Sequence, residues 1–219
     1  MKKWMTILVA VMLVLSMTTA FAAGVPSKTS TTTTTIVGMT GVTGDPLPEG
    51  FEIKIGEDTQ MTTGLIEEMT EFVKGGSSVI DFFDPEVQEE ILKHLNDNKP
   101  DTEALTLDDL KPWQIYEIVS VDAINYEEGM GDVIVTFEFA TPYTMGQRMV
   151  GILDTFSGER VEVEPNVFEF VSEKTVLDAE VTEVVDGKAH VAVTFTEESI
   201  KKMEDAVASA LSIFSEPMK

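Results

Sequence analysis

The stretch that decides the fold is Val176–Phe195, with the sequence VLDAEVTEVVDGKAHVAVTF. At its centre, Asp186-Gly187 favours the two-residue turn of a β-hairpin, because both turn positions need positive φ angles. On the return side, Val191, Val193 and Phe195 alternate with other residues, as in a strand with one buried face. We therefore expect two antiparallel strands joined at this turn.

Residues before this hairpin continue the pattern of short strands. Residues 133–140 alternate apolar with other side chains, as in a half-buried strand. Met149–Leu153 is a continuous apolar run, which is typical of a strand buried on both faces. Shorter or less regular alternation occurs at residues 115–121, 161–164 and 168–170. Together with the hairpin, these runs predict six or seven short strands.

The residues after the hairpin predict a helix and then an ambiguous apolar segment. Thr196 is a suitable N-cap for a helix that begins at about Glu197, with Ile200 and Met203 on its buried side. Residues 211–214 fit either the end of this helix or a closing strand.

In the first half of the chain, the spacing of apolar residues is helical. A helix is predicted over residues 61–73, where apolar residues recur every three or four positions until Gly75-Gly76 ends the segment. Gly64 interrupts it, at a cost of about 1 kcal/mol relative to alanine. A second helix is predicted to start at Asp84-Pro85, with the aspartate as N-cap and the proline at the first helical position.

Runs of helices followed by runs of strands predict an α+β fold. We expect an N-terminal helical segment over residues 45–112. An antiparallel β-sandwich-like or curved-sheet module with a C-terminal helix then follows over residues 113–219. The alternative within this class is a cone-like curved sheet that wraps around the preceding helices.

Residues 1–22 have the composition of a signal peptide. Lys2 and Lys3 precede an apolar run, Met5–Met17, and Ala20-Phe21-Ala22 is a small-x-small cleavage signal. The apolar run is shorter than the roughly 20 residues that a membrane span needs. We therefore expect an exported bacterial protein without membrane insertion after cleavage, located extracellularly, at the cell surface or in the periplasm.

Residues 23–44 are rich in threonine and glycine, with Thr31–Thr35 at their centre. Their low complexity and near absence of charge predict a disordered spacer. A stalk carrying O-linked sugars is the alternative, because clustered hydroxyl groups suit that modification.

The charge of the chain excludes several classes of partner and site. The 39 acidic residues outnumber the 15 basic ones and give a formal net charge of −24. Nucleic acid is excluded as a partner, because phosphate binding needs a basic face. The absence of cysteine excludes disulfides, zinc–thiolate sites and thiol nucleophiles. The 43% hydrophobic content is that of a globular protein.

No catalytic residue is predicted. His94 and His190 are the only histidines, and neither lies in a recognisable nucleophile motif, so we expect both at the surface. Glycosidases use a pair of carboxylates, but such pairs occur by chance among so many acids. They also need aromatic side chains that stack on sugars, and Trp113 is the only tryptophan beyond the signal peptide.

No cofactor and no specific metal site are predicted either. Two acidic loops, Glu127–Asp132 and Asn96–Glu103, offer the oxygen ligands that calcium prefers. Neither matches the EF-hand pattern, so only weak calcium binding is compatible with the sequence.

The loop Ala140–Gly146 is the best candidate for a contact surface, because it connects two expected strands. Pro142, Tyr143 and Met145 would present adaptable side chains to a protein or glycan ligand. The alternative is that Tyr143 folds back and covers the end of the sheet.

The leading functional hypothesis is a secreted or cell-surface, non-catalytic binding or structural module. Its basis is the absence of a recognisable catalytic motif in the sequence. A small secreted hydrolase that uses carboxylates is the alternative from another class. A third hypothesis is an inhibitor or chaperone-like partner of an exported enzyme.

Overall fold

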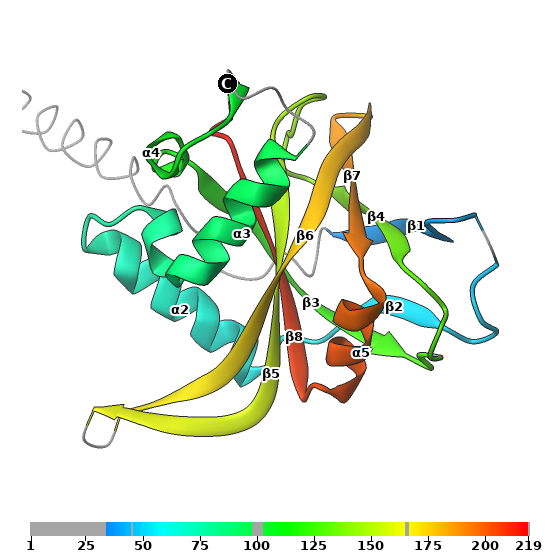
Figure 1. Cartoon of the computed structure of the whole chain (residues 1–219), viewed down its shortest axis with the longest axis horizontal. Coiled ribbons are helices and arrows are strands. Elements are labelled where there is room, and N and C mark those ends of the chain that lie inside the picture. The colour runs from blue at the N-terminus through cyan, green and yellow to red at the C-terminus, as the bar shows by residue number, and fades with distance from the viewer. Residues whose placement is uncertain (1–33, 45, 98–102, 165–166, 219) are drawn as a thin grey trace, which may run out of the picture.

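One antiparallel sheet organises the residues that the computed structural model describes, which are 34–44, 46–97, 103–164 and 167–218. The eight strands of this region are β1 (Thr35–Gly41), β2 (Glu52–Ile55), β3 (Gln114–Ile124), β4 (Val133–Phe139), β5 (Met149–Glu164), β6 (Val167–Val185), β7 (Lys188–Phe195) and β8 (Ala208–Ser215). Their order across the sheet is β1-β4-β7-β6-β5-β8-β3-β2. The sheet is strongly curved, and its end strands β1 and β2 contact each other, so it is nearly closed (Figure 1).

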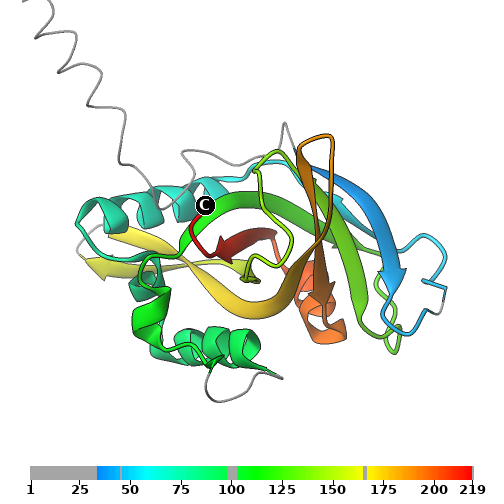
Figure 2. The ribbon, with the colours of Figure 1, turned by 90° about the horizontal axis from the view of Figure 1, so that it is seen from above.

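The helices lie outside the curved sheet, except for one at its end. The helical elements are α2 (Gln60–Lys74), the 3-10 helix η1 (Val79–Phe82), α3 (Pro85–Asn96), α4 (Leu107–Leu110) and α5 (Glu197–Asp205). Figures 1 and 2 show α2, α3 and α4 on one side of the sheet, away from β1 and β2. Helix α5 connects β7 to β8 and closes one end of the sheet's interior with Ile200 and Met203. None of the helices in the described region is long and apolar enough to cross a membrane.

Two apolar cores result, one on each face of the sheet. The inner core lies inside the curve and contains side chains such as Val135, Phe137, Leu153, Val193 and Leu211. The outer core lies between the sheet and the helices and contains side chains such as Met69, Ile91, Ile118, Ile152 and Phe214. Strand β8 is buried along its whole length because its alternate residues enter both cores.

Local sequence signals account for the ends of the main helices. Thr59 forms a capping box with Thr62 at the start of α2, and Gly75 follows its last residue. Asp84 precedes α3, with Pro85 at the first helical position. The side chain of Thr196 accepts a hydrogen bond from the backbone N–H of Ser199 at the start of α5. The three helices begin at Gln60, Pro85 and Glu197, each within one residue of the position that the sequence predicts.

The hairpin at Asp186-Gly187 is also confirmed. Both residues have positive φ angles, 52° and 81°, as a two-residue turn between twisted antiparallel strands requires. Residues 211–214 belong to β8, so the strand alternative for that segment is correct.

The α+β class is confirmed as a mixed fold with a nearly closed antiparallel sheet. The alternative that the sheet wraps around the helices is wrong, because strand side chains fill the inside of the curve. The helices pack on the outer face instead, where they share the outer core with β3, β5 and β8.

Two strands lie where the sequence predicts other structure. β1 occupies the end of the expected 23–44 spacer, and β2 lies within the expected 45–112 helical segment. Both are short edge strands that pair with distant partners, β4 and β3, so local periodicity gives little sign of them. The rest of the spacer up to residue 33, and the expected signal peptide over residues 1–22, lie outside the described residues.

Strands β5 and β6 extend beyond the rest of the sheet as a long hairpin. β8 pairs with β5 only up to Phe156, and the two strands continue together past that point. We call this projecting part, residues 157–164 of β5 and 167–172 of β6, the arm (Figure 1). The sequence patterns at 149–153, 161–164 and 168–170 therefore belong to two long strands instead of three short ones.

Candidate functional site

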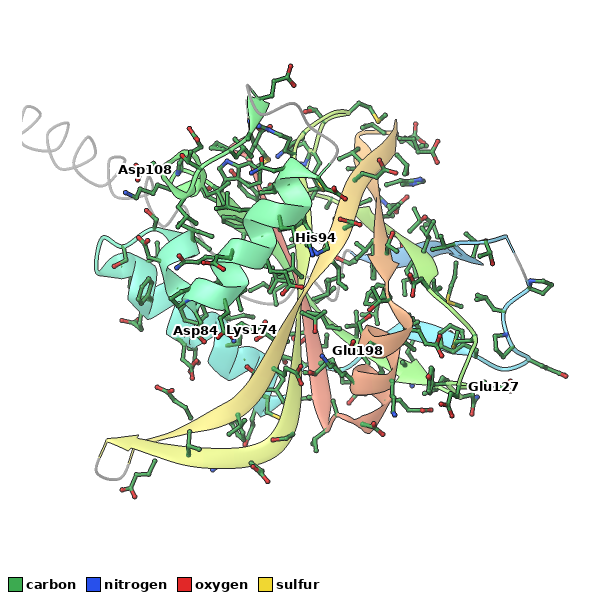
Figure 3. All side chains as sticks on the ribbon, viewed as in Figure 1. Asp84, His94, Asp108, Glu127, Lys174 and Glu198 are labelled. Carbon is green, nitrogen blue, oxygen red and sulfur yellow. The ribbon has the colours of Figure 1, made fainter. Side chains whose placement is uncertain are left out.

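A groove of about 830 Å³ lies between α2 and the arm. Its lining combines apolar, aromatic and acidic side chains with a single lysine, Lys174. The lining residues are Met61, Gly64, Leu65, Glu68, Glu71, Phe72, Phe82, Asp84, Phe156, Val161, Glu169, Phe170, Val171, Ser172 and Lys174. Figure 3 labels two of these lining residues, Asp84 and Lys174. We call this feature the arm groove.

Aromatic rings form an anchored wall of the arm groove. The rings of Phe72 and Phe82 meet edge to face, with centroids 5.6 Å apart. Phe82 contacts Phe83 in the same way at 5.7 Å, and Phe83 in turn contacts Phe214 in the outer core. The exposed ring of Phe72 is therefore connected to the core through a chain of ring contacts, which favours a rigid apolar surface.

A buried ion pair lies behind this wall. Asp154 of β5 is directly opposite Lys174 of β6, and the lysine Nζ lies 2.9 Å from the aspartate Oδ1. The hydroxyl of Ser172 donates to the same oxygen at 3.2 Å and accepts a hydrogen bond from Lys174 at 3.2 Å. The Asp154 side chain is fully buried, and that of Lys174 is 18% exposed.

Burial changes the pKa of Asp154 in this pair. Loss of hydration raises the pKa of Asp154, and Lys174 and Ser172 oppose that shift. The second oxygen of Asp154, Oδ2, has no hydrogen-bond partner among the described residues. The contacts of Lys174 and Ser172 are thus directed to Oδ1 of Asp154 and to each other.

The remaining charges of the arm groove are negative. Glu71 pairs with Lys74 of its own helix at 2.5 Å, whereas no ion pair in the described part of the chain involves Glu68, Asp84 or Glu169. Loss of hydration raises the pKa of Glu68, and the nearby charge of Glu169 raises it further. The groove therefore offers carboxylates beside aromatic rings, and its one lysine is paired with the buried Asp154.

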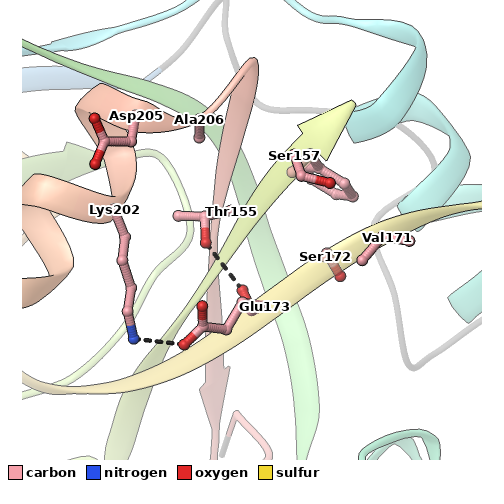
Figure 4. A pocket seen from close by; sticks show the side chains of 9 residues that line it. Thr155, Ser157, Val171, Ser172, Glu173, Lys202, Asp205 and Ala206 are labelled. Atoms are coloured by element: carbon pink, nitrogen blue, oxygen red, sulfur yellow. Dashed lines mark hydrogen bonds and ion pairs between the residues drawn. The ribbon is translucent and has the colours of Figure 1, made fainter. Parts of the chain in front are cut away.

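A second hollow of about 310 Å³ lies between the arm and α5 (Figure 4). Lys202 crosses it and binds Glu173 at 2.5 Å and Glu198 at 2.8 Å. The hydroxyl of Thr155 donates to the backbone carbonyl of Glu173 at 3.3 Å. Because its lysine is held by two carboxylates of the chain, this hollow offers a ligand fewer free charges than the arm groove does.

The predicted contact loop is divided between surface and core. Pro142 is exposed and Met145 is 61% exposed, but Tyr143 is only 1% exposed. Its ring meets Tyr116 and Phe139 edge to face, at centroid distances of 6.2 and 6.1 Å. A direct contact between Tyr143 and a partner does not fit this burial, and the alternative that Tyr143 covers the end of the sheet describes its position.

Glu117 is a buried acid that the sequence does not reveal. A β-bulge between Ile115 and Glu117 turns the carboxyl group inward, where it accepts a hydrogen bond from Thr141. Its Oε2 atom and the hydroxyl of Tyr143 lack hydrogen-bond partners within the described structure. The imperfect alternation of residues 115–121 was the available sign of this bulge.

Both histidines lie in ion-paired positions away from the arm groove. Nδ1 of His94 is 2.7 Å from Asp178 of β6. His190 lies between Glu183 at 2.8 Å and Glu138 at 3.3 Å, and its hydrogen bond to Glu183 is the main cause of its raised pKa. Figure 3 shows His94 on α3 beside β6.

The acidic loop Glu127–Asp132 is connected to α5 by hydrogen bonds. In the loop Glu127–Asp132, the backbone N–H of Gly129 and the hydroxyl of Tyr126 donate to Glu197, and Asp132 accepts from the N–H of Glu197. These carboxylates therefore tie the loop to α5. The loop Asn96–Glu103 lies partly outside the described residues. Across the described ranges, no group of three or more His, Cys, Asp or Glu side chains could hold a metal ion.

Comparisons with known proteins give no relative for this chain: no family model matches it, and no curated protein or solved structure is significantly similar.

Replacing Tyr143 tests its structural position. Tyr143→Ala should lower the free energy of unfolding by about 3–5 kcal/mol, because it leaves a cavity at the end of the inner core. Tyr143→Phe should have little effect or stabilise, since the lost hydroxyl has no partner. Urea unfolding followed by circular dichroism measures both, and an unchanged stability of Tyr143→Ala would contradict the burial.

Replacing either member of the buried ion pair should destabilise the protein unequally. Lys174→Met leaves Asp154 fully buried and uncompensated, so we expect a loss of about 3–5 kcal/mol at pH 7. Asp154→Asn should cost less, because Lys174 is partly exposed and can reach water. The double variant Asp154→Leu/Lys174→Met should recover most of the stability. Equal losses in the two single variants would show that burial does not distinguish the partners.

Proposed function

We propose that the chain is an exported, non-catalytic binding module whose ligand lies in the arm groove. The signal-like residues 1–22 and the excess of acidic residues support export and solubility outside the cell. The curved sheet, with filled cores on both faces, would act as a rigid support for the groove.

Gly64 is the main observation in support of this proposal. It lies inside α2, where glycine costs about 1 kcal/mol relative to alanine. A Cβ atom at this position would meet nothing within 4 Å, and the backbone there has no positive φ angle, so neither packing nor conformation requires glycine. Gly64 lines the arm groove, and its missing side chain leaves that space open for a ligand.

The size and lining of the arm groove support the same function. Small-molecule and cofactor sites occupy about 300–1,000 Å³, and the volume of the arm groove lies within this range. Its lining places aromatic rings next to carboxylates, so it offers both apolar and polar contacts to a ligand. The inner core is filled by large side chains, among them the fully buried rings of Phe137, Phe139 and Phe195.

Two variants of Gly64 test whether the groove binds apolar ligands. We expect the neutral dye Nile red to bind the wild type with a blue-shifted emission, and Gly64→Trp to abolish this binding by filling the groove. Gly64→Ala is the matched control, since it should keep the binding and stabilise the protein by about 1 kcal/mol. If Gly64→Trp is folded and binds the dye like the wild type, the arm groove is not the binding site.

A small hydrolase that uses carboxylates is the second candidate, because Glu68 has a raised pKa beside Glu169. A general acid with a raised pKa next to an ionised carboxylate is the arrangement that glycoside hydrolysis uses. Under the binding proposal, wild type and Glu68→Gln should release p-nitrophenol from p-nitrophenyl glycosides at the same background rate. A wild-type rate that Glu68→Gln removes, and that falls as pH rises and Glu68 loses its proton, would favour the hydrolase.

A further inference from the structure

The arm carries a free strand edge beside the arm groove. Within the described sheet, β6 pairs with β7 only from Ala179 onward, whereas residues 169–172 of β6 pair with β5 alone. No other described hydrogen bond uses the backbone of residues 169–172. A strand edge of this kind leaves N–H and C=O groups available to an added strand.

The same four residues line the arm groove. An extended chain added at this edge would point alternate side chains toward the groove, because successive residues of a strand face opposite sides. The aromatic wall of Phe72 and Phe82 would accept apolar side chains, and its rings also suit the aliphatic stem and charged head of a lysine or arginine.

The charges at the groove select a basic occupant. Glu68 of α2 and Glu169 of β6 both line the arm groove, and the charge of Glu169 contributes to the raised pKa of Glu68. Lys174, which is paired with Asp154, offsets only part of this negative charge: it lowers the pKa of Glu68, but that pKa remains raised. The net charge of −24 would also speed the encounter with a cationic partner.

A second copy of this chain does not fit the same edge as well. Two arms in contact would bring their carboxylates together, for example those of Glu159 and Glu169, and repulsion between like charges disfavours this arrangement.

We propose that the occupant of the arm groove is an extended basic segment of a partner polypeptide. It adds as a strand to the free edge of β6 at residues 169–172 and places a lysine or arginine head between Glu68 and Glu169. This inference rests on the proposed function, because it identifies the ligand of the same groove.

Calorimetric titration of the purified protein with matched synthetic peptides tests the proposal. The probe is a peptide of alternating valine and lysine, compared with versions in which glutamine or glutamate replaces lysine. A fourth peptide keeps the lysines but carries N-methyl groups on the backbone, which prevent strand addition. We expect the lysine peptide to bind about tenfold more tightly than the glutamine peptide at low salt, and the glutamate and N-methylated peptides to bind more weakly still.

Variants locate this binding on the chain. Glu68→Gln and Glu169→Gln should each weaken the lysine peptide several-fold, whereas Glu67→Gln should not, because Glu67 lies on α2 but does not line the groove. Gly64→Trp should abolish binding. Affinity should fall as pH falls, because Glu68 becomes protonated before an ordinary glutamate does, and Glu68→Gln should weaken this dependence.

The outcomes separate this proposal from the proposed function. Equal binding of the lysine and glutamine peptides, or equal loss in Glu67→Gln and Glu68→Gln, would overturn the basic specificity. Undiminished binding of the N-methylated peptide would overturn strand addition. If no peptide binds but Gly64→Trp still removes Nile red binding, the polypeptide ligand is wrong while the groove keeps its function. A concentration-dependent dimer that competes with the peptide would identify a second copy as the occupant instead.

Discussion

The sheet has to bury both of its faces, and the rest of the structure depends on this constraint. Strands β5 and β8 carry apolar side chains on both faces of the sheet. Neither face of the central sheet can therefore remain in water. Curvature covers one face, because strands on opposite sides of the curve pack against each other. Helices α2 and α3 cover the other, together with η1 and the short helix α4. The acidic residues are then left mainly for the surface.

The arm is where this double covering ends. Beyond Phe156 the hairpin has lost β8, and α2 covers it incompletely, so apolar rings and carboxylates share one groove. The Asp154–Lys174 ion pair lies just before the arm, where β8 still pairs with β5. It adds little net stability, since desolvation of the two side chains offsets their attraction. Asp154 and Lys174 lie directly opposite each other on β5 and β6, which favours one register of the hairpin, because a shift by one residue would leave the buried aspartate unpaired.

Features encoded by neighbouring residues could be predicted from the sequence. The Asp186-Gly187 turn, Pro85 at the start of α3 and Thr196 before α5 each act within one turn of the chain, and the structure has all three. The short edge strands β1 and β2 could not be found in this way, because their hydrogen bonds go to strands about 70 or more residues away along the chain.

The candidate site depends still more on distant pairings. Asp154 and Lys174 meet only through the register of β5 and β6, and Glu68 joins them from α2. In the sequence, the available signs were Gly64 inside a helical pattern and Lys174 at the start of a mostly apolar strand segment. The burial of Tyr143 and Glu117 depends on a bulge and on packing at the end of the curve, which periodicity alone does not specify.

The position of β8 in the sheet has a consequence for how the chain folds. It is the last described strand along the chain, yet it lies between β5 and β3 and completes both cores. During synthesis from the N-terminus, β3 and β5 therefore have no partner on their shared side until Ala208–Ser215 has been made. Such long-range pairing gives a high contact order, and proteins of this kind fold slowly. Incomplete chains would expose one free edge on each of two apolar strands, which makes protection from aggregation a requirement of biogenesis.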